Sequence, residues 1–511
     1  MKERSNNKQL LINLAATVVG FVVNLGIQFF LTPFIVSSLG PAAYGFVGLS
    51  NNIITYTQLI AIALNSMASR FITIKYTQGD IESANKYFSS VFYSNIALGA
   101  FILLILTGCI VYLQYILNIP TELILEVKLL LAFLSVNCII SLLTNIYSIA
   151  TFVKNRLDLS SICNIISNIF RAVGLYICFT LFTPHIWYIG LIGTIVTIYL
   201  AFTNYGFTKK LTPDLYISRI NYEWEKVKEL VSSGIWNTIS QLGTIIGQGL
   251  DLIIANLFIG AVAMGVFSIS RQIPFIIISL VATISSVFTP SLTQLYAKGK
   301  IEELQKNLNK SIRLSSIFVL IPIVFLWIYG FDFYKLWLPN QDSYQLQVLT
   351  ILCSLELILS LPLEPLWNIF IVTNKLKIST SFMLCNHLIT FIIVIVGVHF
   401  ADNSFTQLLI LASTRTILGI IRSLTFLPLY GAYCLKLNRK TFYSPILRTF
   451  ITFVISMILC ICVNEIFTIE SWWHLIIAGI VTTIICGIFS LFITLQKSDR
   501  HFLLNRIRLK M

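Results

Sequence analysis

The chain has 511 residues, of which 57% are apolar and 11% are charged, and its formal net charge is +14. Soluble domains carry about 25% charged and 45–50% apolar residues. A soluble chain of this length could not bury so much apolar surface, so the composition excludes a cytosolic enzyme, a disordered chain and a secreted disulfide scaffold. At about 20 apolar residues per spanning helix, the chain holds at most about fourteen membrane spans.

Apolar runs follow one another along the whole chain. The first, at about 10–36, is longer than a signal-peptide core and has no small-residue cleavage site, so it predicts a retained span. The others lie at about 43–68, 87–114, 127–152, 160–182, 186–206, 230–258, 262–294, 312–331, 345–372, 378–399, 405–428, 446–467 and 472–494. They predict an all-α polytopic membrane protein with about 14 transmembrane helices.

The basic residues outside these runs fall in every second loop. The intervening loops hold almost none beyond Lys128 and Lys335. Because positive charge stays on the cytoplasmic side of membrane proteins, the alternation predicts an even number of spans with both termini in the cytoplasm. It also explains the net charge of +14 without a nucleic-acid partner.

The two halves of the chain are similar in sequence. Residues 39–53 (LGPAAYGFVGLSNNI) match residues 259–273 (IGAVAMGVFSISRQI) at a shift of 220, and the polar loop 76–83 matches 296–303 at the same shift. Polar loops seldom match by chance at one shift, so we expect parallel repeats related by an axis along the membrane normal.

The repeat predicts how the chain is divided. We expect an N-terminal six-helix lobe at 1–207, a cytoplasmic linker at 208–229 and a C-terminal six-helix lobe at 230–430. Two additional transmembrane helices at 431–495 and a basic cytoplasmic tail at 496–511 follow.

Polar side chains recur inside several apolar runs. In the run at 230–258, Asn237, Gln241, Thr244, Gln248 and Asp251 recur at spacings of four and three, which predicts one shared helix face. Any one such residue can serve merely as a hydrogen bond between helices, but a stripe repeated in three runs favours a water-filled cavity. The expected cavity-lining residues are Asn24, Gln28, Asn51, Asn237, Gln241 and Gln248.

Ionisable residues also lie inside the runs, where a charge is costly and usually faces a cavity or a partner. They are Arg171, Arg271, Arg415, Arg422, Asp251, Glu356 and Glu364. Four arginines against three carboxylates suit an anion such as phosphate or pyrophosphate, and the amides suit sugar hydroxyls. Internal ion pairs and side chains that reach the membrane interface are the alternative explanations.

Motifs of common membrane enzymes and pumps are missing. The sequence has no GxxxxGK[ST], GxSxG or HExxH, and no loop between runs is long enough for a catalytic domain. Its ten cysteines lie mostly in apolar runs and its five histidines are scattered, so we expect no metal site and no cofactor. A transport protein is therefore favoured over an enzyme.

The span number, the parallel repeat and the opening polar helix point to one family. The same family is indicated by the segment FLTPFIVSSLGPAAYGFVGLSNNI and by its counterpart in the second half, DLIIANLFIGAVAMGVFSISRQI. These features resemble the polysaccharide (O-antigen and capsule) flippases. These belong to the multidrug/oligosaccharidyl-lipid/polysaccharide (MOP) exporter superfamily of MATE-like proteins. The resemblance implies two six-helix lobes in a V, with a central cavity between the first, second, seventh and eighth spans.

The resemblance also implies a function. Flippases of this family move undecaprenyl-pyrophosphate-linked oligosaccharide from the cytoplasmic to the periplasmic leaflet of the bacterial inner membrane. Arg271 fits contact with the anionic head best by position, and Arg171, Arg415 and Arg422 are further candidates. We expect alternating access coupled to a proton or sodium gradient, with Asp251, Glu356 and Glu364 as the coupling groups.

The expected partners are the lipid-linked oligosaccharide, membrane lipids, and the glycan polymerase and chain-length machinery. Three alternatives stay open: a cation-coupled multidrug exporter of the same fold, a lipid II flippase, and a non-transporting scaffold for glycan assembly. Asn51 stands where the lipid II flippase pattern has a second arginine, which weakens that alternative. The last two spans are a candidate groove for the polyprenyl tail.

Overall fold

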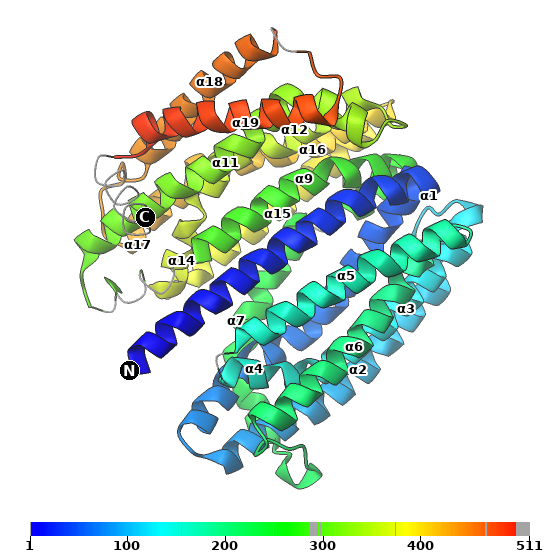
Figure 1. Cartoon of the computed structure of the whole chain (residues 1–511), viewed down its shortest axis with the longest axis vertical. Helices are drawn as coiled ribbons and strands as arrows, with labels where there is room; N and C mark the ends of the chain where they lie inside the picture. Colours follow the sequence, from blue (N-terminus) through cyan, green and yellow to red (C-terminus); the bar gives the residue numbers. More distant parts are fainter. Residues whose placement is uncertain are drawn as a thin grey trace. The chain divides into compact units, whose positions relative to one another are not determined.

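The computed structural model consists of α-helices joined by short turns (Figure 1). It describes residues 2–496 except 155, 249, 287, 289–291, 293–294, 297, 374 and 466–467, and no strand occurs among the described residues. The chain divides by packing into two units, Met1–Gly265 (unit 1) and Val266–Met511 (unit 2). The predicted all-α membrane fold is confirmed.

Unit 1 is built from long helices and three short 3₁₀ turns. Its α-helices are α1 (Lys2–Thr77), α2 (Ile81–Ile116), α3 (Ile124–Thr144), α4 (Ile149–Val153), α5 (Leu157–Leu181), α6 (Trp187–Leu211), α7 (Trp224–Gln248) and α8 (Leu250–Ile254). The 3₁₀ turns are Thr121–Leu123, Asn145–Ser148 and Arg219–Asn221. A π-helical turn, Ala255–Ile259, follows α8, and α9 (Ala261–Ser286) runs from the end of unit 1 into unit 2.

Unit 2 continues with helices that are more often interrupted. They are α11 (Ile301–Trp337), α12 (Ser343–Leu355), α13 (Leu357–Ser360), α14 (Pro365–Val372), α15 (Leu376–His399), α16 (Ser404–Leu424), α17 (Phe426–Cys434), α18 (Tyr443–Asn464) and α19 (Trp472–Phe489). The run expected as one span at 345–372 is split into α12, α13, a 3₁₀ turn (Leu361–Leu363) and α14. Pro362 and Pro365 explain the break, because proline cannot donate the backbone hydrogen bond of a continuous helix.

Twelve helical segments among the described residues are long and apolar enough to cross a membrane. The first, Val22–Thr77, has 56 residues, which would extend about 84 Å as one straight helix, whereas the apolar core of a bilayer is ~30 Å thick. Gly40 interrupts it with φ 81° and ψ 168°, so α1 contains two of the predicted spans. The polar helix α7 is not among the twelve, and the predicted number of fourteen is not established by these segments alone.

The backbone has local similarities at the shift of the predicted repeat. Gly40 and Gly260, 220 residues apart, both have positive φ angles, 81° and 133°, and so do Gly79 and Gly299, with 81° and 69°. The turns around the second pair share hydrogen bonds at that shift: Gly79 N and Gly299 N donate to Tyr76 O and Tyr296 O. The turns before α2 and α11 therefore have the same local geometry at the predicted shift.

The packing boundary differs from the expected lobe boundary. The sequence repeat places the second lobe at 230–430, whereas α7 and α8 pack within unit 1. A Cβ on Gly234 would lie 1.9 Å from the carbonyl oxygen of Ala63, so the absence of a side chain lets the α7 backbone touch α1. Sequence repetition and packing therefore divide this chain at different residues. The tail from residue 497 onward lies outside the described residues.

Candidate functional site

The expected site residues fall into an amide group in unit 1 and a charged group that lies mostly in unit 2. On the first half of α1, the exposed Gln28 donates from Nε2 to Asn24 Oδ1 at 3.4 Å, one helical turn away. Both amides therefore lie on one face of this helix, as the spacing predicts. The first 18 side chains of the chain lie outside the description, so the earlier part of this stripe is not assigned.

The second half of α1 divides its polar residues between two roles. Asn51 is exposed, and among the described residues its Nδ2 donates only to Val47 O of its own helix, at 2.8 Å. Gln58 instead donates to Cys138 Sγ at 3.4 Å, and Asn65 exchanges amide hydrogen bonds of 2.9 and 3.0 Å with Asn95. Asn51 is therefore available to a ligand, whereas the deeper amides join helices within unit 1.

The described residues of the stripe predicted from Asn237 to Asp251 differ in exposure. Asn237 and Gln241 are exposed on α7, and the side chain of Gln248 lies outside the described residues. Asp251 lies on α8 and is only 8% exposed. Asp251 therefore differs from Asn237 and Gln241 in exposure. The side chain of Thr244 also lies outside the described residues, so the face shared by all five residues stays a prediction.

The π-helical turn after Asp251 holds an asparagine that sequence reasoning missed. Asn256 is fully buried, and its Oδ1 accepts from Asn118 N at 2.9 Å, while its Nδ2 donates to Asn118 O at 3.1 Å. This pair ties the end of α8 to the loop after α2. Two asparagines 138 residues apart carry no sequence signal of their pairing.

Arg171 is the most accessible of the expected arginines. It lies near the middle of the apolar segment Asp158–Leu181, on α5, with its side chain exposed and without an ion-pair partner among the described residues. Asn164, two turns away, is also exposed, and Asn168 between them is half-buried. The predicted shared face of these three residues is therefore compatible with a cationic and amide surface on α5.

Arg422 and Glu356 form one buried ion pair in unit 2. Arg422 Nη2 lies 2.5 Å from Glu356 Oε1, and both side chains are less than 15% exposed. The Glu356 carboxyl group occupies the space beside Gly419, where a Cβ would lie 2.0 Å from Glu356 Cδ. The nearby Glu364 also attracts Arg422 electrostatically. The two residues expected to bind an anion and to carry an ion are thus direct partners.

The other two arginines of the expected site are half-buried in unit 2. The Arg271 guanidinium of α9 lies over the ring of Phe267, one turn earlier, at 5.4 Å from the ring centroid. This cation–π contact orients the cation. Arg415 lies on α16, two turns before Arg422.

The comparisons with known proteins agree with this architecture. A family model described as polysaccharide biosynthesis protein matches residues 38–341. A Bacillus subtilis (strain 168) protein, described as the uncharacterized membrane protein EpsK, is 28% identical over 497 residues, which cover 97% of this chain and 98% of that protein.

Two solved structures share the fold. The lipid II flippase MurJ in an inward closed conformation has a TM-score of 0.68 at 15% identity, covering 93% of this chain and 98% of that one. An inward-facing multidrug resistance MATE family transporter of the MOP superfamily has a TM-score of 0.67 at 14% identity, covering 83% and 98%. The family match spans more than half of the residues, and the fold match extends over most of them. The chain belongs to the polysaccharide biosynthesis protein family and has the transporter fold of the MOP superfamily.

Proposed function

We propose that this protein moves undecaprenyl-pyrophosphate-linked oligosaccharide from the cytoplasmic to the periplasmic leaflet of the bacterial inner membrane. The product would serve surface polysaccharide assembly, as O-antigen or capsule. Family membership supports a role in polysaccharide biosynthesis, and the fold shared with a lipid II flippase supports lipid-linked cargo. Alternating access of the two repeats is the proposed mechanism.

Arg171 is the observation that carries this proposal. An exposed guanidinium without an ion-pair partner among the described residues, in the middle of an apolar helix, is unfavourable in lipid and needs a polar path. A pyrophosphate would accept its paired N–H donors, and the neighbouring Asn164 amide would suit sugar hydroxyls. Arg271, oriented by Phe267, is the second proposed contact for the anionic head.

The Glu356–Arg422 pair supports a proton-coupled cycle. While Glu356 is ionised, it holds Arg422 at 2.5 Å and occupies its Nη2 donor. Protonation of Glu356 would weaken the pair and release Arg422 to an anion. We propose proton coupling at this pair, with Asp251 and Glu364 as secondary candidates.

We also propose that both termini lie in the cytoplasm. The proposed partners are the glycan polymerase and the chain-length machinery.

Depletion of the protein in its native cell, with leaflet-resolved measurement of lipid-linked oligosaccharide, tests the function. We expect the oligosaccharide to accumulate on the cytoplasmic leaflet, and surface glycan to be lost. Arg171→Ala should fail to restore glycan at normal protein levels. Arg439→Ala, an exposed arginine in the α17–α18 loop, is the matched control and should restore it.

The alternatives predict different results in the same cells. Unchanged glycan lipids with increased sensitivity to cationic dyes would indicate a multidrug exporter and overturn the proposal. Accumulation of the peptidoglycan precursor alone would indicate a lipid II flippase. Normal glycan with every intramembrane arginine replaced would indicate a non-transporting scaffold.

A further inference from the structure

Unit 1 contains a groove beside the segment that connects α6 to α7. Its volume is about 610 Å³, and α1, α2 and α7 form its apolar walls with residues such as Leu64, Leu98 and Val227. Arg219, Tyr222 and Trp224 line the groove from the connecting segment and the start of α7. This volume lies within the ~300–1,000 Å³ range of small-molecule sites, and a mostly apolar lining with few polar groups suits an amphiphile.

The connecting segment is held in place by α2. Tyr222 packs edge-on against Tyr93 of α2, with ring centroids 6.2 Å apart. Hydrogen bonds from the segment converge on two turns of α2: Asn85 with Asp214 O and Tyr216 N (2.9 Å each), Ser89 with Ser218 N (3.1 Å) and Ser90 with Glu223 N (2.9 Å). The backbone that carries Arg219 therefore has a fixed position next to the groove.

Arg219 has no charge partner in the part of the chain that the structure describes. Its side chain is exposed and makes no ion pair or hydrogen bond with another described residue. Three carboxylates close to it in sequence have other partners: Asp214 accepts from Tyr76 (3.3 Å), Glu223 pairs with Lys86 (2.9 Å) and Glu229 accepts from Tyr87 (2.5 Å). A fourth, the exposed Glu225, makes no ion pair with Arg219. The groove therefore presents one uncompensated guanidinium to a ligand.

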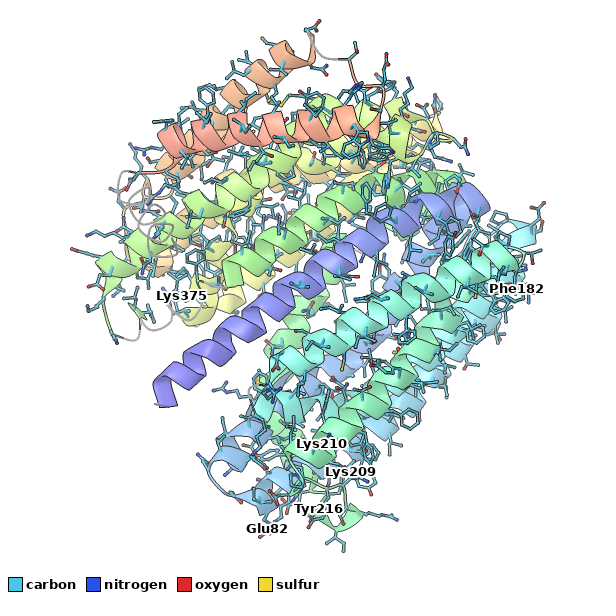
Figure 2. The ribbon with its side chains drawn as sticks, viewed as in Figure 1. Glu82, Phe182, Lys209, Lys210, Tyr216 and Lys375 are labelled. Carbon is cyan, nitrogen blue, oxygen red and sulfur yellow. The ribbon has the colours of Figure 1, made fainter. Side chains whose placement is uncertain are left out.

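The same segment has the side chains of a membrane interface. Ile220 is 92% exposed and Trp224 is 57% exposed, which is costly in water but normal at the level of lipid headgroups. Figure 2 shows Tyr216 of this segment at the same end of unit 1 as Lys209 and Lys210. The groove is therefore accessible from the lipid interface at the basic end of unit 1.

One polar group inside the groove is also without a partner. Ser94 lines it from α2, and its Oγ is buried and has no hydrogen-bond partner among the described residues. A buried hydroxyl that lacks a partner is unfavourable, so a ligand oxygen beside Ser94 would stabilise it. An ester or glycerol oxygen of a lipid would meet this requirement.

We propose that the groove binds one anionic glycerophospholipid of the adjacent leaflet. The phosphate of the lipid lies at Arg219, and an acyl chain lies between α1, α2 and α7. An ester or glycerol oxygen of the lipid accepts a hydrogen bond from Ser94. One free guanidinium matches the single charge of a phosphodiester, whereas a pyrophosphate would require more cations. The site is separate from the arginines assigned to the cargo and does not depend on the transported substrate.

Quenching of Trp224 by brominated lipids tests the proposal on the full-length protein in phosphatidylcholine nanodiscs. We expect dibrominated phosphatidylglycerol to quench fluorescence saturably at a low mole fraction, and dibrominated phosphatidylcholine to quench only in proportion to its amount. Trp224→Phe should remove the saturable component, which assigns it to this tryptophan. Arg219→Ala should raise the half-saturating fraction about tenfold, as expected for one lost charge-assisted hydrogen bond.

Two further variants separate charge from shape. Ala97→Phe should fill the groove and abolish saturable quenching while Arg219 is intact, and Arg439→Ala should leave it unchanged. Equal quenching by both lipids, or no effect of Arg219→Ala, would overturn the proposal. Displacement by inorganic phosphate alone would reassign the site to a free anion, and tighter displacement by undecaprenyl phosphate would reassign it to the cargo. Either result would likewise overturn it.

Discussion

Glu356 and Arg422 form one ion pair, although the sequence predicted ion coupling for Glu356 and anion binding for Arg422. Both side chains are buried, and each neutralises the charge of the other. Removing one partner of such a pair leaves an unpaired buried charge, which costs more than the pair itself contributes. The small residue Gly419 makes room for the carboxyl group, so three positions depend on each other.

Replacing the carboxylate should reveal this dependence. Glu356→Ala should lower the free energy of unfolding by about 3–5 kcal/mol, because Arg422 remains charged and buried. Adding Arg422→Leu should recover most of that loss. Thermal unfolding of the purified variants in detergent measures both effects. If the single variant unfolds like the parent protein, the pair does not contribute to stability.

Gly419 provides a second test of the same cluster. A Cβ here would lie 2.0 Å from Glu356 Cδ, so Gly419→Ala should displace the carboxylate and lower the melting temperature. The same change in a Glu356→Ala background should have little effect, because the obstructing group is gone. A double-mutant cycle measures this non-additivity. Equal effects in both backgrounds would contradict the contact.

At the scale of elements, α1 and α7 use polar residues in two ways. Asn51 on α1 and Asn237 on α7 are exposed, whereas Asn65 pairs with Asn95 of α2 inside unit 1. Hydrogen bonds between membrane helices contribute about 0.6 kcal/mol on average, so Asn65 and Asn95 hold helices together rather than bind cargo. The close approach of α7 to α1 at Gly234 also holds helices together. It is possible because glycine has no side chain.

A single methyl group should disturb this packing. Gly234→Ala would place a Cβ 1.9 Å from a backbone oxygen, which cannot move like a side-chain end, so we expect a loss of about 1–3 kcal/mol. Gly206→Ala on α6 is the matched control, since no atom lies within 4 Å of its added Cβ. It should be neutral or stabilise the helix by up to about 1 kcal/mol. Similar melting temperatures for the two variants would argue against the close contact.

At the scale of the whole molecule, the repeat and the membrane topology are connected. Equivalent glycines and turns recur 220 residues apart in the two halves of the sequence. In unit 1, Glu82, Lys209, Lys210 and Tyr216 lie at one end and Phe182 lies at the opposite end (Figure 2). The loop charges predict that the end with Lys209 and Lys210 faces the cytoplasm.

Cysteine labelling in intact cells tests this orientation. In a variant without its ten native free cysteines, Phe182→Cys should react with a membrane-impermeant maleimide added from the periplasmic side. Gln78→Cys, exposed in the turn before α2, should react only after the membrane is opened. Both cysteines should react with a membrane-permeant maleimide, which shows that each thiol is accessible to the reagent. The opposite pattern would show that the termini are periplasmic.

Several features could be predicted from the amino-acid sequence because they are local. Gly79 and Gly299 stand at the same place in two similar loops, and the positive φ of each follows from the turn that it occupies. The apolar runs predicted the membrane helices, but Pro362 and Pro365 divided one expected span into pieces. Burial is not local in this way: helical spacing predicts that Asp251 continues the stripe of Asn237 and Gln241, and tertiary packing leaves Asp251 only 8% exposed.

The sequence by itself determined the membrane environment, the parallel repeat and the turns that join its helices, because span length, charge alternation and turn chemistry involve neighbouring residues. Only the tertiary structure decided which polar side chains are accessible. It paired Arg422 with Glu356, joined Asn65 to Asn95, left Arg171 exposed and placed Arg219 beside a groove. The physical reason is that burial and pairing depend on helices distant in the chain, and helical periodicity contains no information about those neighbours.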